Sequence, residues 1–147
     1  MRQAYEESCR KHGHEPGPAF FPDRSTPSVC FVADDVDEAW AELGEYLLHD
    51  ARTYAAWNPG NEVSAGFTHV DTVGELRQAA ASHVIYSVPE AISRVRAGHM
   101  LAMSPLCGGL PPEIAWPYLE RMGKVVLPEA STSAEGALGE LLSNKNG

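Results

Sequence analysis

Residues 28–57 read SVCFVADDVDEAWAELGEYLLHDARTYAAW, and this stretch decides the class of fold. Its first part, VCFVA, is β-branched and aromatic without polar alternation, which is typical of a strand buried on both faces. Asp35 and Glu38 then form a capping box that begins a helix. The apolar residues that follow share one helical face: Trp40, Leu43, Leu47 and Tyr54. The stretch therefore predicts a buried strand followed directly by a long amphipathic helix.

Strand and helix patterns return further along the chain. HVIYS at 83–87 is a brief extended segment, and Ser87 with Glu90 begins another capped helix. HMLAMS at 99–104 is short and apolar and is predicted as a second buried strand, and a helix follows from Pro112. Because strands alternate with helices, the chain is expected to be an α/β protein with a parallel sheet.

Two convincing strands are too few for four or five helices to close a core around them. Either further strands lie in PAFFP at 18–22 and HVIYS at 83–87, or the chain is part of something larger. The sequence leaves both explanations open.

Composition excludes several classes of partner. The chain has 147 residues, the length of one domain, and its net charge of −9 disfavours binding to nucleic acid or to an anionic membrane surface. No stretch is long enough for a membrane span, and the N-terminus lacks the pattern of a signal peptide. Three cysteines without a close pair fit a reducing compartment, so we expect a cytoplasmic protein.

Three stretches together resemble the C-terminal part of luciferase-like flavin-dependent oxidoreductases. They are CFVADDVDEAWAELGEYLLHDARTYAAWNPGN at 30–61, SVPEAISRV at 87–95 and PLCGGLPPEIAWPYLERMGKVVLP at 105–128. The resemblance implies a TIM-type β/α barrel, which needs about 250 residues. Residues 1–130 would then be the C-terminal portion of such a barrel, a partial barrel with few parallel strands, and 131–147 a flexible tail.

The resemblance also implies a cofactor, FMN or deazaflavin, that supports hydride transfer or monooxygenation of a small organic substrate. A barrel binds its ligand at the carboxyl ends of the strands. The candidate cofactor-binding residues are accordingly Ser104, Cys107, Gly108, Gly109 and Trp57. No catalytic residue and no metal ligand is predicted.

Each of these residues also has a simpler interpretation. Gly108 and Gly109 could approach a flavin phosphate, or they could only make a tight turn before the helix. Cys107 could be a nucleophile, but a buried apolar side chain is the more common role of a free cysteine. Asp34 and Asp35 are explained by helix capping, with ligand contact as the alternative.

Half a pocket cannot exclude water or surround a flavin, so the activity of the family is not expected of this chain alone. The alternative is a non-catalytic truncated barrel, or a subunit that completes its sheet with a second copy or another partner chain. Unpaired strand edges favour that alternative because they associate. A small thiol or metal protein, based on the cysteines and histidines, is a third hypothesis.

Overall fold

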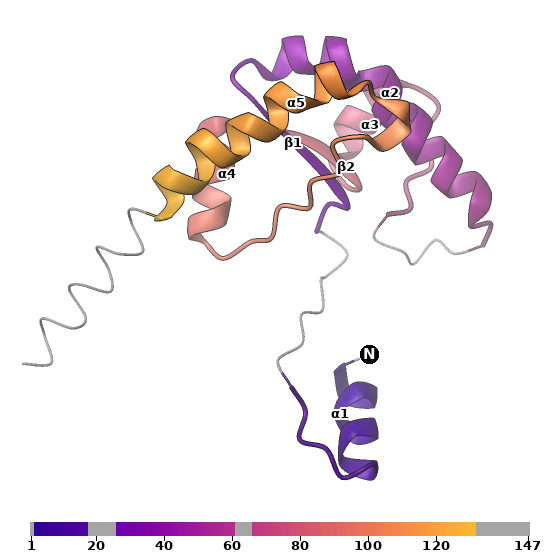
Figure 1. Cartoon of the computed structure of the whole chain (residues 1–147). Coiled ribbons are helices and arrows are strands. Elements are labelled where there is room, and N and C mark those ends of the chain that lie inside the picture. Colours follow the sequence, from indigo (N-terminus) through magenta and orange to yellow (C-terminus); the bar gives the residue numbers. More distant parts are fainter. Residues whose placement is uncertain (1, 18–25, 61–65, 132–147) are drawn as a thin grey trace, which may run out of the picture.

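The computed structural model describes residues 2–17, 26–60 and 66–131 (Figure 1). Its elements in chain order are α1 (Arg2–Lys11), β1 (Val29–Ala33), α2 (Val36–Trp57), α3 (Val73–Ala79), β2 (His83–Ser87), α4 (Val88–Arg96), the 3-10 turn η1 (Cys107–Gly109), α5 (Pro112–Arg121) and the π-helical turn η2 (Met122–Val126). The predicted buried strand and the long helix after it are confirmed as β1 and α2, and HVIYS forms β2.

β1 and β2 form a two-stranded parallel sheet, in register from Val29 opposite His83 to Ala33 opposite Ser87. Helices cover both faces. The first face packs on α2, α3 and the start of α5, and its buried core includes Phe31, Leu43, Leu47, Leu76, Ile85 and Tyr118. The second face packs on α4 and η2 through Cys30, Val32, Val84, Tyr86, Ala91, Met122 and Val126. Alternate strand residues therefore point into two separate apolar layers.

Side-chain caps begin three of the helices. Asp35 Oδ1 accepts hydrogen bonds from the backbone N–H groups of Asp37 (2.8 Å) and Glu38 (3.0 Å), which confirms Asp35 as the N-cap but without the reciprocal Glu38 bond of the predicted capping box. Ser87 caps α4 in the same way. Thr72 and Glu75 form a complete reciprocal capping box at α3, which the sequence analysis did not identify.

The expectation of a partial TIM-type barrel is wrong for this structure. The described part of the chain is mostly helical and contains one sheet of two strands. Residues 99–104 form no strand: Ala102 accepts one backbone hydrogen bond from Cys30 (2.7 Å), no ladder continues from it in the described residues, and Met100 is 48% exposed. An apolar run becomes a strand only where a neighbouring strand pairs along it, and this run has no such partner in the described residues.

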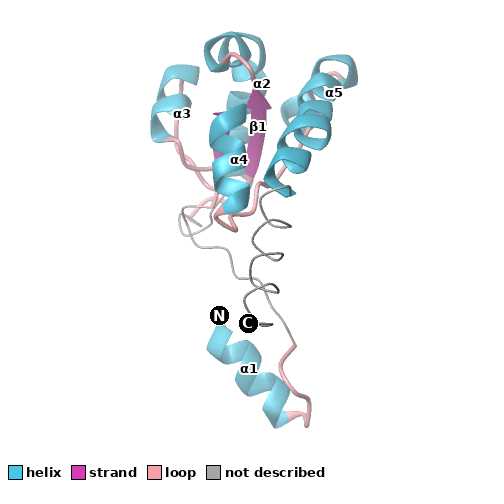
Figure 2. Ribbon diagram, turned by 90° about the vertical axis from the view of Figure 1, so that its left-hand side faces the viewer, coloured by secondary structure: helices cyan, strands magenta, loops and turns pink. Residues whose placement is uncertain are grey.

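Two other expectations fall outside the described residues, namely a strand in PAFFP at 18–22 and the nature of the tail from residue 132 onward. α1 buries none of its residues, and both views show it apart from the sheet and its helices (Figures 1 and 2). None of the described helices has the length and hydropathy needed to cross a bilayer.

Candidate functional site

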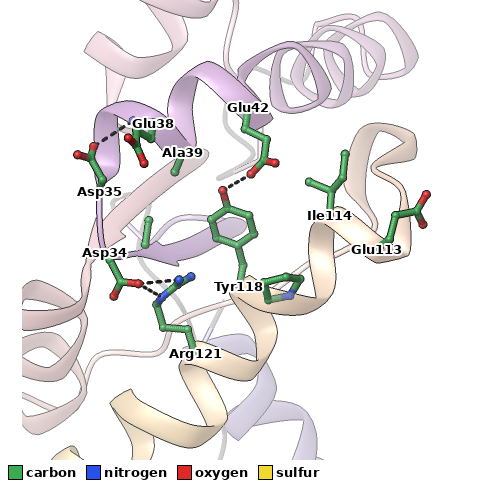
Figure 3. A pocket seen from close by; sticks show the side chains of 11 residues that line it. Asp34, Asp35, Glu38, Ala39, Glu42, Glu113, Ile114, Tyr118 and Arg121 are labelled. Carbon is green, nitrogen blue, oxygen red and sulfur yellow. Dashed lines mark hydrogen bonds and ion pairs between the residues drawn. The ribbon is translucent and has the colours of Figure 1, made fainter.

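A hollow of about 550 Å³ lies at the carboxyl end of β1, between the start of α2 and one side of α5 (Figure 3). We call it the acidic hollow. Its lining contains five carboxylates and one cation: Asp34, Asp35, Glu38, Glu42, Glu113 and Arg121. In open parallel sheets, ligands bind outside the carboxyl ends of the strands, and the acidic hollow lies at this end.

Two pairs of polar side chains in the acidic hollow contact one another. Arg121 forms an ion pair with Asp34, at 2.7 Å from Nη2 to Oδ2, and its Nη1 donates to the carbonyl of Val32. Tyr118 Oη donates to Glu42 Oε2 at 2.5 Å. Burial, followed by the bond to Glu42 and its charge, raises the pKa of Tyr118 well above its ordinary range. Tyr118 is therefore a structural donor, with no tendency to ionise.

The chemistry of the acidic hollow does not suit an anionic ligand. Its one arginine is engaged by Asp34, and the remaining carboxylates repel a phosphate. Among the described residues, no group of three potential ligand side chains is placed to hold a metal ion. The hollow thus offers neither the cationic cradle of a flavin phosphate nor a metal site.

The residues predicted to bind a cofactor lie elsewhere. Gly108 packs on α2, where its N–H donates to Asp50 Oδ1 at 3.2 Å. Ser104 and Cys107 belong to the same turn, since the N–H of Cys107 donates to the carbonyl of Ser104 at 3.1 Å. Gly109 ends η1, and Trp57 at the end of α2 is 78% exposed. None of the five lines the acidic hollow.

The turn and the acidic hollow are at opposite ends of the sheet. Asp50 joins Gly108 to His83, the first residue of β2, whereas Asp34 follows the last residue of β1. The N–H of Gly108 is directed at a carboxylate, which would repel a flavin phosphate. Burial, together with the charge of Asp50, raises the pKa of Cys107 to about 12, so its thiol is protonated and a poor nucleophile. The residues present do not fit a flavin, and that cofactor stays a prediction from the resemblance.

Comparison with known proteins adds no relative. No protein family, curated protein or solved structure matches this chain. The luciferase-like resemblance therefore stays a prediction.

A buried polar cluster, which we call the His83 cluster, links α2 to the amino end of β2. His83 Nε2 contacts Asp50 Oδ2 at 3.0 Å, and His83 Nδ1 contacts Ser82 Oγ at 2.8 Å. An ionised Asp50 can only accept, so the proton of neutral His83 is on Nε2 and the Ser82 hydroxyl donates to Nδ1. Thr68 Oγ1 then donates to Ser82 Oγ, at 2.5 Å.

The His83 cluster contains serine, histidine and aspartate, yet its arrangement is structural. Ser82 and His83 are 0% and 1% exposed, so no substrate reaches the Ser82 oxygen. Its hydroxyl proton is already shared with His83. The helical pattern around Asp50 does not predict this contact, because its partner His83 lies 33 positions away in the chain. A buried strand that begins with histidine is the one local signal that could have found the cluster.

The His83 cluster predicts how stability depends on pH. Burial lowers the pKa of His83, and the hydrogen bond and charge of Asp50 offset part of that effect. The unfolded chain then binds a proton at a pH where the folded protein does not. We expect a constant free energy of unfolding above about pH 7.5, and a decrease as pH falls through about 6.5 toward the lower folded value.

Urea titrations from pH 5.5 to 8 measure this dependence, with His99→Gln as a control because His99 is exposed. That variant should keep the same pH profile. A free energy of unfolding that increases as pH falls through this range would show instead that Asp50 stabilises a cationic His83.

A second hollow, of about 240 Å³, follows the outer edge of β2. We call it the β2 groove. Four consecutive strand residues line it, His83, Val84, Ile85 and Tyr86, with Trp40 and Arg77 on one flank and Glu90 and Arg94 on the other. Within residues 2–17, 26–60 and 66–131, β1 is the one strand that pairs with β2. The groove therefore runs beside the edge of β2 that carries no paired strand in the described residues, between two helical flanks.

The hydrogen-bond pattern identifies which backbone groups point into the β2 groove. The N–H of Val29 donates to Ser82 O, while the N–H of Cys30 points the other way, to Ala102. Backbone groups alternate in direction along a strand, so Val84 and Tyr86 face β1. The N–H and C=O groups of His83 and Ile85 consequently face the groove, and no backbone bond from the described residues reaches them.

Proposed function

We propose that this chain is a non-catalytic α/β subunit that completes its parallel sheet by accepting a strand from another polypeptide in the β2 groove. The observation that carries the proposal is the edge of β2, where the backbone groups of His83 and Ile85 face a groove instead of a third strand. Strand addition uses this kind of edge, because the main chain supplies the hydrogen bonds and the flanks supply specificity.

The side chains of β2 support this proposal. As whole residues, backbone included, His83, Val84, Ile85 and Tyr86 are only 1–7% exposed. Parallel sheets bury their strands on both faces, and a strand in the interior of such a sheet also has a neighbouring strand on each side. β2 has the environment of an interior strand and the hydrogen bonding of an edge strand, and one added strand removes that mismatch.

The edge of β2 also lacks the features that keep strands apart. Natural edges are protected by lysine, proline, a bulge or a covering loop. HVIYS contains neither lysine nor proline, and its pairing with β1 runs through all five residues without a bulge. The groove beside it is open in the described part of the chain. These properties suit an edge that is kept for pairing.

Amide hydrogen exchange by NMR tests whether the edge is available. In a dilute monomer, the Ile85 amide is expected to exchange about 100-fold faster than the Tyr86 amide, because only Tyr86 is bonded to β1. Val84 is the matched control and should be as protected as Tyr86. Equal protection of Ile85 and Tyr86 in the monomer would overturn the proposal, since it would mean that the chain covers its own edge.

A further inference from the structure

We infer that the strand accepted in the β2 groove is β2 of a second copy of this chain, paired antiparallel about a two-fold axis. This inference rests on the proposed function and names its partner. The dimer would contain one continuous four-stranded sheet, with the helical layers of each copy on the same two faces.

The backbone of the β2 edge is complementary to its own two-fold image. His83 and Ile85 each direct one donor and one acceptor outward. In an antiparallel pair centred on Val84, His83 of each copy lies opposite Ile85 of the other, and each such pair exchanges two N–H···O=C bonds. Four hydrogen bonds form, and no outward donor or acceptor of these two residues is left over. A two-fold contact of this kind is closed, so assembly stops at the dimer.

Charge also favours the β2 groove as the place where two copies meet. Two chains of net charge −9 repel one another over most of their surfaces. The lining of the groove differs from the rest, because its charged side chains are Arg77, Arg94 and a single acid, Glu90. This face therefore offers less repulsion than the acidic hollow, with its five carboxylates.

The α4 flank carries both signs of charge at a spacing that suits self-pairing. Glu90 and Arg94 are one helical turn apart, 47% and 38% exposed, and form an ion pair of 3.0 Å within the helix. The two-fold axis places α4 antiparallel to α4 of the second copy. Glu90 of each copy then meets Arg94 of the other, and the pairs within each helix become a network of four charges. A second copy carries both the matching backbone groups and the matching charges. A strand from an unrelated protein would need both features in its own sequence.

The test is a charge reversal followed by sedimentation equilibrium of the full chain at several concentrations. Wild type is expected to be a dimer. Glu90→Arg or Arg94→Glu alone places like charges across the axis twice, and should raise the dimer Kd about tenfold. The double exchange Glu90→Arg/Arg94→Glu restores opposite charges and should return Kd to near the wild-type value. A mixture of the two single variants should form a heterodimer more tightly than either forms a homodimer.

Arg96→Glu is the matched control for Arg94→Glu, since it makes the same charge change on α4 at a residue that does not line the groove. Its Kd should equal that of wild type. Thermal unfolding of every variant verifies the fold. In the dimer, the Ile85 amide should become as protected as the Tyr86 amide.

The outcomes separate this inference from the function on which it rests. A chain that stays monomeric up to about 1 mM, with a rapidly exchanging Ile85 amide, overturns self-pairing and leaves strand acceptance standing. An Ile85 amide that is protected in the monomer overturns both. If a dimer forms but its Kd is unchanged by the charge reversals and the Ile85 amide still exchanges rapidly, its interface lies elsewhere. That result overturns the inference.

Discussion

Replacing Gly108 by alanine is expected to lower the free energy of unfolding by about 4 kcal/mol or more, a large part of the stability of an ordinary domain. A Cβ atom at this position would lie 1.9 Å from the carbonyl oxygen of Tyr46 and 2.7 Å from its carbonyl carbon. Both atoms belong to the backbone of α2, so neither can move aside as a side chain would. Gly108 also has φ +60°, in the left-handed region, which adds strain for any other residue.

Gly109 provides the control for this prediction. Its φ of +77° is also left-handed, but a Cβ atom there would have no neighbour within 4 Å. Gly109→Ala should therefore lose only the conformational term, about 1–2 kcal/mol. Urea unfolding of both variants measures the difference. Equal losses at the two positions would show that α2 adapts to the added carbon, and that the close contact at Gly108 is not decisive.

The glycine pair illustrates which features were visible in the sequence. A tight turn before the helix was one of the two interpretations of Gly108 and Gly109, and the structure has a 3-10 turn at Cys107–Gly109 before α5, although no strand leads into it. The partner of that turn was not visible, because Tyr46 is 62 positions earlier in the chain and nothing local marks its carbonyl as a contact. Local signals such as the Asp35 cap and the β-branched run of β1 were sufficient for the elements that they begin.

The pairing of strands was beyond local patterns. Residues 99–104 are as apolar as a strand, yet they remain outside the sheet because no ladder forms beside them. HVIYS was predicted to be extended. Which of its two edges lacks a partner strand depends on the side on which β1 pairs, and the local sequence does not show that. The β2 groove is lined by Trp40 and Arg77 on one side and by Glu90 and Arg94 on the other. These residues come from different helices, so the sequence alone does not show that they lie beside β2.

The His83 cluster gives the second large effect. Asp50→Ala should lower the free energy of unfolding by about 3 kcal/mol. Asp50 accepts from His83 Nε2 and from the N–H of Gly108, and its removal leaves two donors without a partner beside the core. The Asp50 side chain is 34% exposed, so water can reach part of the vacated space and limits the loss.

Asp37→Ala is the matched control, because it removes an aspartate from the same helix. The Asp37 side chain is 81% exposed and pairs with Arg77 at the surface, so its loss should cost less than about 1 kcal/mol. Chemical denaturation of both variants at pH 8 gives the comparison. Similar losses for the two would mean that the His83 cluster stabilises the fold no more than a surface ion pair.

The same variant also tests how the cluster responds to acid. Asp50 is the group that raises the pKa of His83 against the effect of burial. Without it, burial acts alone and the folded pKa decreases further, so the interval in which only the unfolded chain binds the proton becomes wider. Asp50→Ala should therefore lose more stability than wild type between pH 7.5 and 5.5, in addition to its constant loss at pH 8. If the two pH profiles are parallel, Asp50 acts on His83 and Gly108 only as a neutral acceptor would, and the charge of the cluster has no part in holding β2 to α2.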